Sequence, residues 1–540
     1  MLPAASQILV TEDTPRVVLG AGAAGASTAY YLQKYAERDG VAVNITIFEK
    51  TDHIGGRTLT VNPYDNPHEA VELGASIFVE QNFILYNASQ EFELPLRDPY
   101  GKGADSLVII WDGEKIVFEQ SEDSWQWWDL TKLFWRYGLA PYRTKKLVGA
   151  AQTKFHKLYE SPYFPFRSLT ARAFELDLAS LTGQTGEQYL EQNNVGQSFA
   201  HEIIQAATRV NYATNLGKIH GLTTLVSMAP EGAVAVSGGN WRIFDRMVKN
   251  TGAALYLNTS VSSITLDGKQ ANAAEAKYLI STRPTDKEDA NEETDVIAFD
   301  DVVIATPYQF SNIKTAGDII KTAIDEIPYV RLHVTIFASP FQMSPDFFSL
   351  DDKAKIPTSV LTTLADDDDA SSGANGSGKA GFFSISSLRT IVNPATLQEE
   401  YLYKIFSPEK ITPEFLSQLL GVPVPDSFIT PQESGDEGDT VILQPISWYY
   451  PHVFFSYPQE LPRVTFQDPI LREGLYYTSG MESFISTMET SALMGMNVAR
   501  LIVDNCLGLN TGNAVDKEQA RPSPQKGKQS ILAGVQEDEL

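Results

Sequence analysis

A glycine-rich turn near the beginning of the chain has the spacing that binds the pyrophosphate of a dinucleotide. In GAGAAG, Gly20, Gly22 and Gly25 fit the pattern GxGxxG. The first glycine permits a tight turn, the second lets the pyrophosphate approach the backbone, and the third lets a helix pack closely on a strand. Glu49 follows 24 residues after Gly25, where a carboxylate can accept hydrogen bonds from a ribose diol. Small-residue turns also join strands to helices for structural reasons alone. The spacing between the glycine turn and Glu49 is therefore the feature that favours a nucleotide site.

A second glycine pair follows Glu49 after five residues, in the sequence DHIGGRT. Gly55 and Gly56 allow a close approach to the backbone, and Arg57 can hold a phosphate with two parallel hydrogen bonds. A GxGxxG turn, an acidic strand end and a GGR loop in this order resemble the FAD-dependent amine oxidase and glutathione-reductase-type superfamily. Dehydrogenases that use NAD alone do not usually carry the second loop. The resemblance implies that FAD is the cofactor.

A βαβ unit must position these residues, and the flanking sequence predicts one. PRVVLGAGAAGASTAYYLQKY is typical of a strand, a turn and a helix, and VAVNITIFEK is typical of a second strand. Residues 95–230 look mainly helical, and strand patterns return after them. The predicted fold is α/β: a Rossmann-like FAD-binding domain built from the discontinuous segments 15–95, 232–320 and 465–508, a mixed helix/sheet substrate domain of residues 96–231 and 321–464, and a disordered tail at 509–540. Two acidic stretches, 285–295 and 365–381, predict solvated loops.

Three later segments resemble parts of the same superfamily that surround FAD. In LNTSVSSI, the resemblance places Val261 beside the adenine, and in DDVVIATP it places Thr306 near the flavin. The segment GLYYTSGMES and the helix after it are similar to the part that closes over the ribityl chain and the flavin ring. On that resemblance Gly480, Met488 and Glu489 also lie near FAD.

Five segments together resemble a narrower group, the prenylcysteine oxidase (prenylcysteine lyase) family, from about Val17 to Ile502. They are VNYATNLGKIHGLTTLVSMAP, AVSGGNWRIFDRM, YVRLHVTIFA, SWYYPHVFFSYP and YYTSGMESFISTMETSALMGMNVA. The resemblance implies an FAD-dependent thioether oxidase that acts on farnesyl or geranylgeranyl cysteine. Hydride transfer from C1 of the prenyl group to flavin N5 would yield cysteine, a prenyl aldehyde and hydrogen peroxide. The acidic insertion at 365–381 and the charged tail depart from the family.

Two other functions remain open at this point. One is an FAD-dependent oxidase or dehydrogenase of another isoprenoid or hydrophobic metabolite, for example in secondary metabolism. The other is a flavoprotein or lipid-binding scaffold without catalysis. Polar candidates for the catalytic pocket are His333 in a predicted strand, and Tyr212 and Asn240 beside the expected flavin. A lone histidine in an apolar strand is more often a hydrogen-bonded core residue. Since no cysteine pair or second nucleotide motif can take electrons from the flavin, dioxygen is the predicted oxidant.

An aromatic stretch of the chain suits a prenyl substrate. Four of the seven tryptophans lie in WQWWDLTKLFWRYGL, residues 125–139, and the apolar residues spread over much of a helix circumference. Such a helix fits an ordinary buried position, the wall of a substrate tunnel, or a ridge that makes peripheral contact with a membrane.

Composition excludes several classes of protein. With 68 acidic and 42 basic residues the formal charge is −26, so nucleic acid is not an expected partner. The single cysteine, Cys506, excludes an intramolecular disulfide, and no metal-ligand spacing is present. No apolar run reaches the roughly 18 residues of a membrane span, and the first residues do not predict a signal peptide. Relatives in the resembled family are lysosomal or secretory, and glycosylation sequons begin at Asn44, Asn87, Asn258 and Asn375, so an endomembrane compartment is the expectation, with a glycoprotein as its consequence.

Overall fold

The computed structural model describes residues 14–99, 106–121, 128–229, 232–267, 278–287, 295–317, 319–320, 323–351, 353–368, 376–427 and 444–509. Apart from residue 509, the predicted tail lies outside these residues. The same holds for the sequon at Asn375 and for parts of the two acidic stretches.

The first sheet of the described chain contains six strands in the order β20-β21-β13-β1-β2-β9. Its members are β1 (Thr14–Leu19), β2 (Val43–Phe48), β9 (Ala254–Tyr256), β13 (Asp301–Ile304), β20 (Ile470–Arg472) and β21 (Leu475–Tyr477). All neighbouring pairs are parallel except β20 with β21. Three distant stretches of the chain therefore meet in one parallel sheet. The prediction of an α/β, Rossmann-like fold is confirmed.

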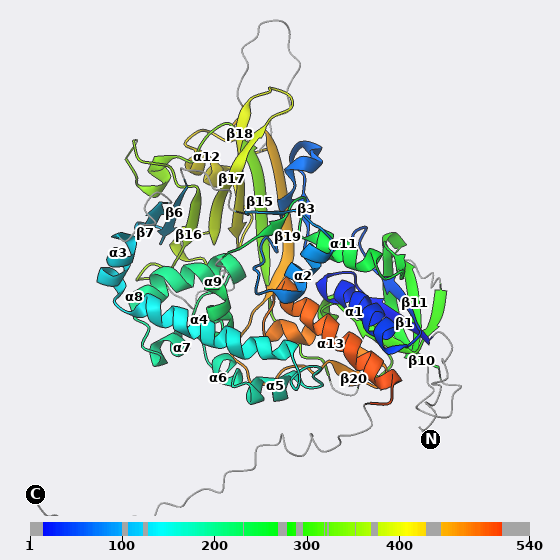
Figure 1. The fold of residues 1–540 in the computed structure, drawn as a ribbon. Helices are drawn as coiled ribbons and strands as arrows, with labels where there is room; N and C mark the ends of the chain where they lie inside the picture. Colours follow the sequence, from blue (N-terminus) through cyan, green and yellow to red (C-terminus); the bar gives the residue numbers. More distant parts are fainter. Residues whose placement is uncertain are drawn as a thin grey trace, which may run out of the picture.

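Two helices pack against each other on this sheet, α1 (Ala23–Asp39) and α13 (Met488–Cys506) (Figure 1). Their backbones approach so closely that a Cβ on Gly495 would lie 2.3 Å from the carbonyl oxygen of Ala24. The hydroxyl of Ser27 donates to the carbonyl of Ala492 at 2.7 Å. The small residues of both helices thus hold the C-terminal helix beside the helix that follows the glycine turn.

A second, larger sheet of the described residues has seven strands in the order β19-β15-β18-β17-β16-β6-β7. Its members are β6 (Leu107–Trp111), β7 (Ile116–Ser121), β15 (Tyr329–Ser339), β16 (Ser359–Thr362), β17 (Ser384–Val392), β18 (Glu399–Ser407) and β19 (Trp448–Pro458). Neighbours are antiparallel except β16 with β6. The hairpin β6–β7 lies in the stretch that looked mainly helical from its sequence. The apolar run LVIIW of β6 pairs with β16 of this sheet, so long-range strand pairing decides the structure of the hairpin.

The remaining strands form a four-stranded sheet and two small ribbons among the described residues. They are β10 (Thr259–Leu266), β11 (Tyr278–Pro284), β12 (Asp295–Phe299) and β14 (Lys314–Thr315) in the first, and β3 (Thr60–Val61), β4 (Val71–Glu72), β5 (Leu96–Arg97) and β8 (Ala235–Val236) in the ribbons.

Most of the other helices form a layer below the seven-stranded sheet (Figure 1). The helices are α2 (Phe83–Glu91), α3 (Trp128–Tyr137), α4 (Ala140–His156), α5 (Leu169–Glu175), α6 (Ala179–Thr182), α7 (Gly186–Gln192), α8 (Gln197–Phe199), α9 (Gln205–Tyr212), α10 (Gly221–Ser227), α11 (Trp241–Lys249) and α12 (Pro413–Leu420). The fully buried Arg209 of α9 ties this layer to the sheet, because its guanidinium donates to Thr362 of β16 and to the carbonyl of Ser377. None of the helices that the structure describes is both long and apolar enough to cross a bilayer.

Candidate active site

The glycine turn and the GGR loop lie against each other. Gly22 and Gly55 form an isolated parallel bridge, and the N–H of Gly55 donates to the carbonyl of Ala21 at 3.0 Å. A Cβ on Gly25 would lie only 1.9 Å from the carbonyl oxygen of Gly20, so only glycine allows α1 to start there. No side chain caps the N-terminus of α1, and its leading N–H groups can therefore bind an anion. This cradle fits a pyrophosphate.

Glu49 is held beside the same turn. One oxygen of its buried carboxylate accepts from the N–H of Ala21 at 2.7 Å, and the other accepts from the N–H and the hydroxyl of Thr51 at 2.9 Å. Its backbone carbonyl accepts from the N–H of Thr259, at the start of β10. These bonds fix a carboxylate next to the pyrophosphate cradle, where it fits a ribose. Its contact with a cofactor stays a prediction.

Val261 and Thr306 lie in the two strand regions where the sequence placed them. Val261 belongs to β10, the strand that begins beside Glu49. Thr306 follows β13, and a Cβ on Gly20 would lie 3.8 Å from that of Thr306. Thr306 thus borders the glycine turn, and Val261 packs against the core cluster that contains Val17 and Leu19 of β1. The roles of both residues toward the cofactor remain predictions.

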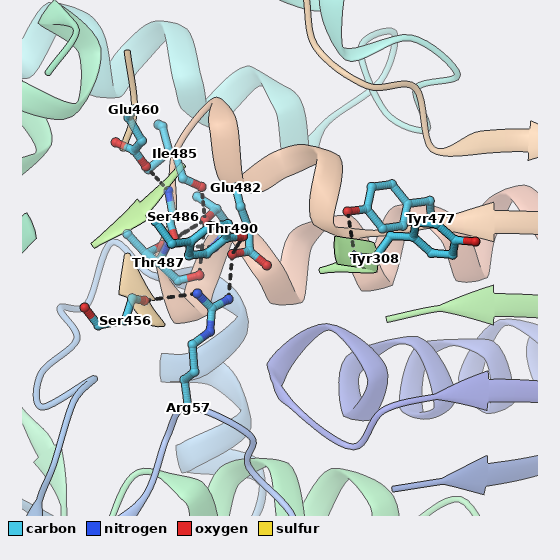
Figure 2. Close-up of polar contacts among 11 residues, drawn as sticks. Arg57, Tyr308, Ser456, Glu460, Tyr477, Glu482, Ile485, Ser486, Thr487 and Thr490 are labelled. Atoms are coloured by element: carbon cyan, nitrogen blue, oxygen red, sulfur yellow. Dashed lines mark hydrogen bonds and ion pairs between the residues drawn. The ribbon is translucent and has the colours of Figure 1, made fainter. Parts of the chain in front are cut away.

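Arg57 links the GGR loop to the segment that contains Gly480 (Figure 2). Its guanidinium donates to the carbonyl of Ser456 at 3.0 Å and to the carboxylate of Glu482 at 2.6 Å. The hydroxyl of Tyr329 donates to the same carboxylate at 2.8 Å. Glu482 is buried, so this ion pair connects the GGR loop to the short helix of residues 479–483. A contact between Arg57 and a phosphate stays a prediction.

The segment around Gly480 and the start of α13 is buried and tightly packed. A Cβ on Gly480 would lie 2.5 Å from the carbonyl of Gln467. Met488 begins α13 behind a capping box of Thr487 and Thr490. These contacts leave little freedom to the backbone beside the expected flavin ring.

Glu489 is a buried acid in the first turn of α13, and its carboxylate reaches the start of α2. Its carboxylate accepts from the N–H groups of Ile84 and Leu85, at the beginning of α2, and from the hydroxyl of Tyr159 at 2.8 Å. Burial raises the pKa of Glu489 to about 7, because removal from water disfavours the charged form. The carboxylate thus joins α13 to α2.

A further buried acid, Glu460, lies behind the loop that precedes α13 (Figure 2). It accepts from the N–H of Ser486 at 2.6 Å, and its backbone carbonyl accepts from the N–H of His220. Burial raises the pKa of Glu460 to about 8. No spacing in the sequence indicated this residue, because its neighbours in the fold are distant along the chain.

We predict that Glu460 makes stability depend on pH. Its folded pKa lies above the ordinary value of 4.5, so the folded chain holds an extra proton. The resulting stability is complete below pH 4.5 and is lost as the pH rises towards 8. Glu460→Gln is therefore expected to increase the free energy of unfolding at pH 8, on the order of 1–3 kcal/mol, with little change at pH 5. Denaturant titrations at both pH values measure this, with the exposed Glu191→Gln as control. An equal effect at both pH values would contradict the prediction.

A cavity of about 1140 Å³ lies between the seven-stranded sheet and the helices α4, α9 and α10, with residues 485–490 at one end. Mostly apolar side chains of the helices and both polar and apolar side chains of the sheet line it. The lining includes Val148, Ala151, Phe155, Val210, Leu222, Leu225, Val226, Ser359, Ser384, Ser386, Lys404, Tyr457, Met488 and Glu489. Expected cofactor residues and the lining of this cavity thus meet at the start of α13.

The three polar candidates from the sequence lie in different places. Tyr212 lines the cavity, and its ring centre is 5.7 Å from that of Tyr457. Asn240 is fully buried and holds backbone groups together, accepting from the N–H of Val236 and donating to the carbonyl of Ala75. His333 in β15 is absent from the described lining of the cavity. Catalytic roles for all three stay predictions.

The aromatic stretch of residues 125–139 is only partly described. In α3, Phe134 is 55% exposed and Trp135 is 86% exposed. An ordinary buried helix is therefore the wrong interpretation for these two side chains, and residues 125–127 lie outside the described part of the chain.

Comparison with known proteins gives matches over nearly the whole chain. Residues 120–516 match the model of the prenylcysteine lyase family, and residues 18–87 match that of an NAD(P)-binding Rossmann-like domain. A farnesylcysteine lyase of Arabidopsis thaliana is 26% identical over 528 residues, which cover 94% of this chain and 92% of the relative. Prenylcysteine oxidase 1 of Rattus norvegicus is 27% identical over 503 residues, which cover 90% of this chain and 88% of the relative.

Solved structures share the fold. Variants of putrescine oxidase with a redesigned cofactor site match with a TM-score of 0.52 at 13% identity, over 91% of this chain and 99% of theirs.

Proposed function

This chain belongs to the prenylcysteine lyase family, and from that membership and the site described above we propose that it oxidises the thioether of a prenylcysteine. The observation that carries the proposal is the cavity of about 1140 Å³, whose apolar walls reach the start of α13. Such a cavity suits a ligand with a long apolar chain and a small polar head.

The chain is an FAD-dependent oxidoreductase. In the proposed site, the turn at Gly22 would hold the pyrophosphate and Glu49 the ribose, and residues 480–489 would lie near the flavin ring. Bound FAD supplies a two-electron acceptor for hydride. The chain's own residues hold the prenyl group against the helices and keep bulk water from the site, because the walls formed by α4, α9 and α10 are largely apolar.

The proposed reaction follows from the chemistry of the substrate. C1 of the prenyl group is allylic and bonded to sulfur, so loss of a hydride leaves a cation that both neighbours stabilise. Water adds to this carbon, and the hemithioacetal then collapses. With dioxygen as the final oxidant, one prenylcysteine, one water and one dioxygen give one prenyl aldehyde, one cysteine and one hydrogen peroxide.

An anaerobic titration of the yellow holoprotein with S-farnesylcysteine tests this proposal. Stoichiometric bleaching, followed by detection of farnesal and cysteine, is the expected result, with peroxide formed in air and slower turnover when C1 is deuterated. Oxidation at sulfur would refute the proposed chemistry. Bleaching by other isoprenoids alone would assign a different substrate, and a flavin that no such compound reduces would indicate a scaffold.

We also propose that the chain takes its apolar substrate from an anionic membrane surface. Four large apolar side chains, on α3, at the N-cap of α4 and on α4, are each more than half exposed: Phe134, Trp135, Leu139 and Tyr142. Residues 130–157 contain seven Lys or Arg residues and no Asp or Glu, although the formal net charge of the whole chain is −26. Both features favour an anionic bilayer. Because α4 also lines the cavity, a prenyl chain could pass from the surface to the site along one helix.

Trp135→Ser is expected to weaken binding to vesicles of phosphatidylserine and phosphatidylcholine by about 10-fold, because a large apolar side chain no longer enters the lipid. Binding of the wild type should weaken as salt increases. Co-sedimentation measures both effects. Phe174→Ser is the control, since Phe174 is 58% exposed on α5, outside this basic stretch. Equal binding to vesicles of pure phosphatidylcholine would contradict the proposed charge complementarity.

A further inference from the structure

A buried lysine faces the cavity from the seven-stranded sheet. Lys404 lies in β18, is 9% exposed and belongs to the lining of the cavity. Its ammonium donates to the carbonyl of Glu72 at 2.6 Å and to the hydroxyl of Ser76 at 3.2 Å, and lies 4.7 Å from the centre of the Phe406 ring. The position of Lys404 in the fold therefore brings a cation to the cavity. Arg389 of β17 also lines the cavity, but its guanidinium forms an ion pair with Glu69.

The charge of Lys404 has no ion-pair partner among the described residues. The nearby acid, Glu72, accepts from the N–H of Asn240 with its carboxylate and from the lysine with its backbone carbonyl. The two side chains form no ion pair, although the charge of Glu72 acts on the ammonium from a longer distance. An ammonium carries three N–H donors, and the two bonds to Glu72 and Ser76 use two of them. A buried cation without a counterion is costly. Burial lowers the pKa of Lys404 to about 8, although the charge of Glu72 opposes this shift.

Polar groups surround this lysine on the cavity side. Ser386 of β17 is its direct partner across the strand pair, and both residues line the cavity. Ser76 also lines it. Opposite them, Leu222, Leu225 and Val226 of α10 present an apolar wall. The cavity thus has a cationic, hydroxyl-bearing side and an apolar side, which matches an amphiphilic acid.

We propose that Lys404 binds the α-carboxylate of the substrate's cysteine moiety, with Ser386 beside it, while the prenyl chain lies against the helices. This inference rests on the proposed function. The carboxylate supplies the direct ion pair that Lys404 lacks among the described residues, and charge-assisted hydrogen bonds of this kind are stronger than neutral ones. The subsite selects a free prenyl amino acid over its methyl ester or its decarboxylated analogue, because neither of these carries the negative charge.

Three thioethers test the subsite: S-farnesylcysteine, its methyl ester, and S-farnesylcysteamine, which lacks the carboxylate. Wild-type protein is expected to show a KM for the free acid about 10- to 100-fold below those for the other two. Lys404→Met should raise the KM for the free acid by a similar factor and change the KM for S-farnesylcysteamine by less than about 3-fold, with kcat little affected. Lys404→Arg should keep part of the preference, and Lys379→Met, at an exposed ion pair, should keep all of it.

Two results would overturn the inference. The first is a wild type that does not distinguish the acid from S-farnesylcysteamine, which decides the matter even if Lys404→Met does not fold. The second is a Lys404→Met protein in which the KM values for the free acid and for S-farnesylcysteamine rise by the same factor. That result would show that Lys404 has only a structural role. If no thioether reduces the flavin, the proposed function fails, and the subsite is then tested by equilibrium binding of the same compounds through the flavin absorbance. Tighter binding of the acid to wild type alone supports it, and equal binding refutes it.

Discussion

Replacing Gly22 with valine is expected to give a folded protein that no longer retains FAD. A Cβ on Gly22 has no neighbour closer than 3.8 Å, and its φ of −74° suits any residue. The added side chain therefore has a Cβ that clashes with nothing, and it is expected to enter the space where a pyrophosphate approaches the backbone. We expect a loss of affinity for FAD of at least about 100-fold, or roughly 3 kcal/mol.

Flavin absorbance per mole of purified protein measures this loss, and circular dichroism shows whether the fold persists. Gly149→Ala is a suitable control, since nothing lies within 4 Å of a Cβ there. Gly25→Ala is a contrasting case, because its Cβ would clash with the carbonyl of Gly20 and should prevent correct folding. A fully yellow Gly22→Val protein would remove the pyrophosphate site from the glycine turn.

Removing the positive charge of Arg57 is expected to lower both the free energy of unfolding and the affinity for FAD. In Arg57→Met, the buried carboxylate of Glu482 keeps the hydroxyl of Tyr329 but loses its ion pair. An uncompensated buried charge of this kind costs about 3–5 kcal/mol. Thermal unfolding of the apoprotein should show a lower Tm.

The double variant Arg57→Met/Glu482→Gln separates the two roles of Arg57. It removes the unpaired charge, so we expect it to regain much of the lost stability. If Arg57 also holds a phosphate of FAD, the affinity for FAD should stay low in the double variant. Recovery of both stability and affinity would show that Arg57 acts only through Glu482, and no recovery of stability would contradict the role of the ion pair.

Features that depend on short stretches of chain were predictable. The α/β fold, the family and FAD are confirmed, and they rest on motifs such as Gly20–Gly25 followed by Glu49. A tight turn between a strand and a helix needs glycine for local steric reasons. Residue type and spacing therefore carry this information directly.

Residues in the cavity were not predictable in the same way. His333 and Lys404 both lie in strands of the seven-stranded sheet, yet only Lys404 faces the cavity. A strand alternates its side chains between two faces, and the sequence does not say which face a helical layer will cover. The same limit applies to β6–β7, whose place in the sheet depends on pairing with β16, about 250 residues away.

The sequence by itself determined the nucleotide cradle, the class of cofactor and the family, because each depends on local spacing or on similarity along the whole chain. Only the tertiary structure decided the partners of the buried charges. Arg57 meets Glu482 across 425 residues, and Glu489 meets the start of α2 across 405. Such contacts shift a pKa or leave a cation unpaired through burial, and burial is a property of the packed molecule that no single segment of the chain contains.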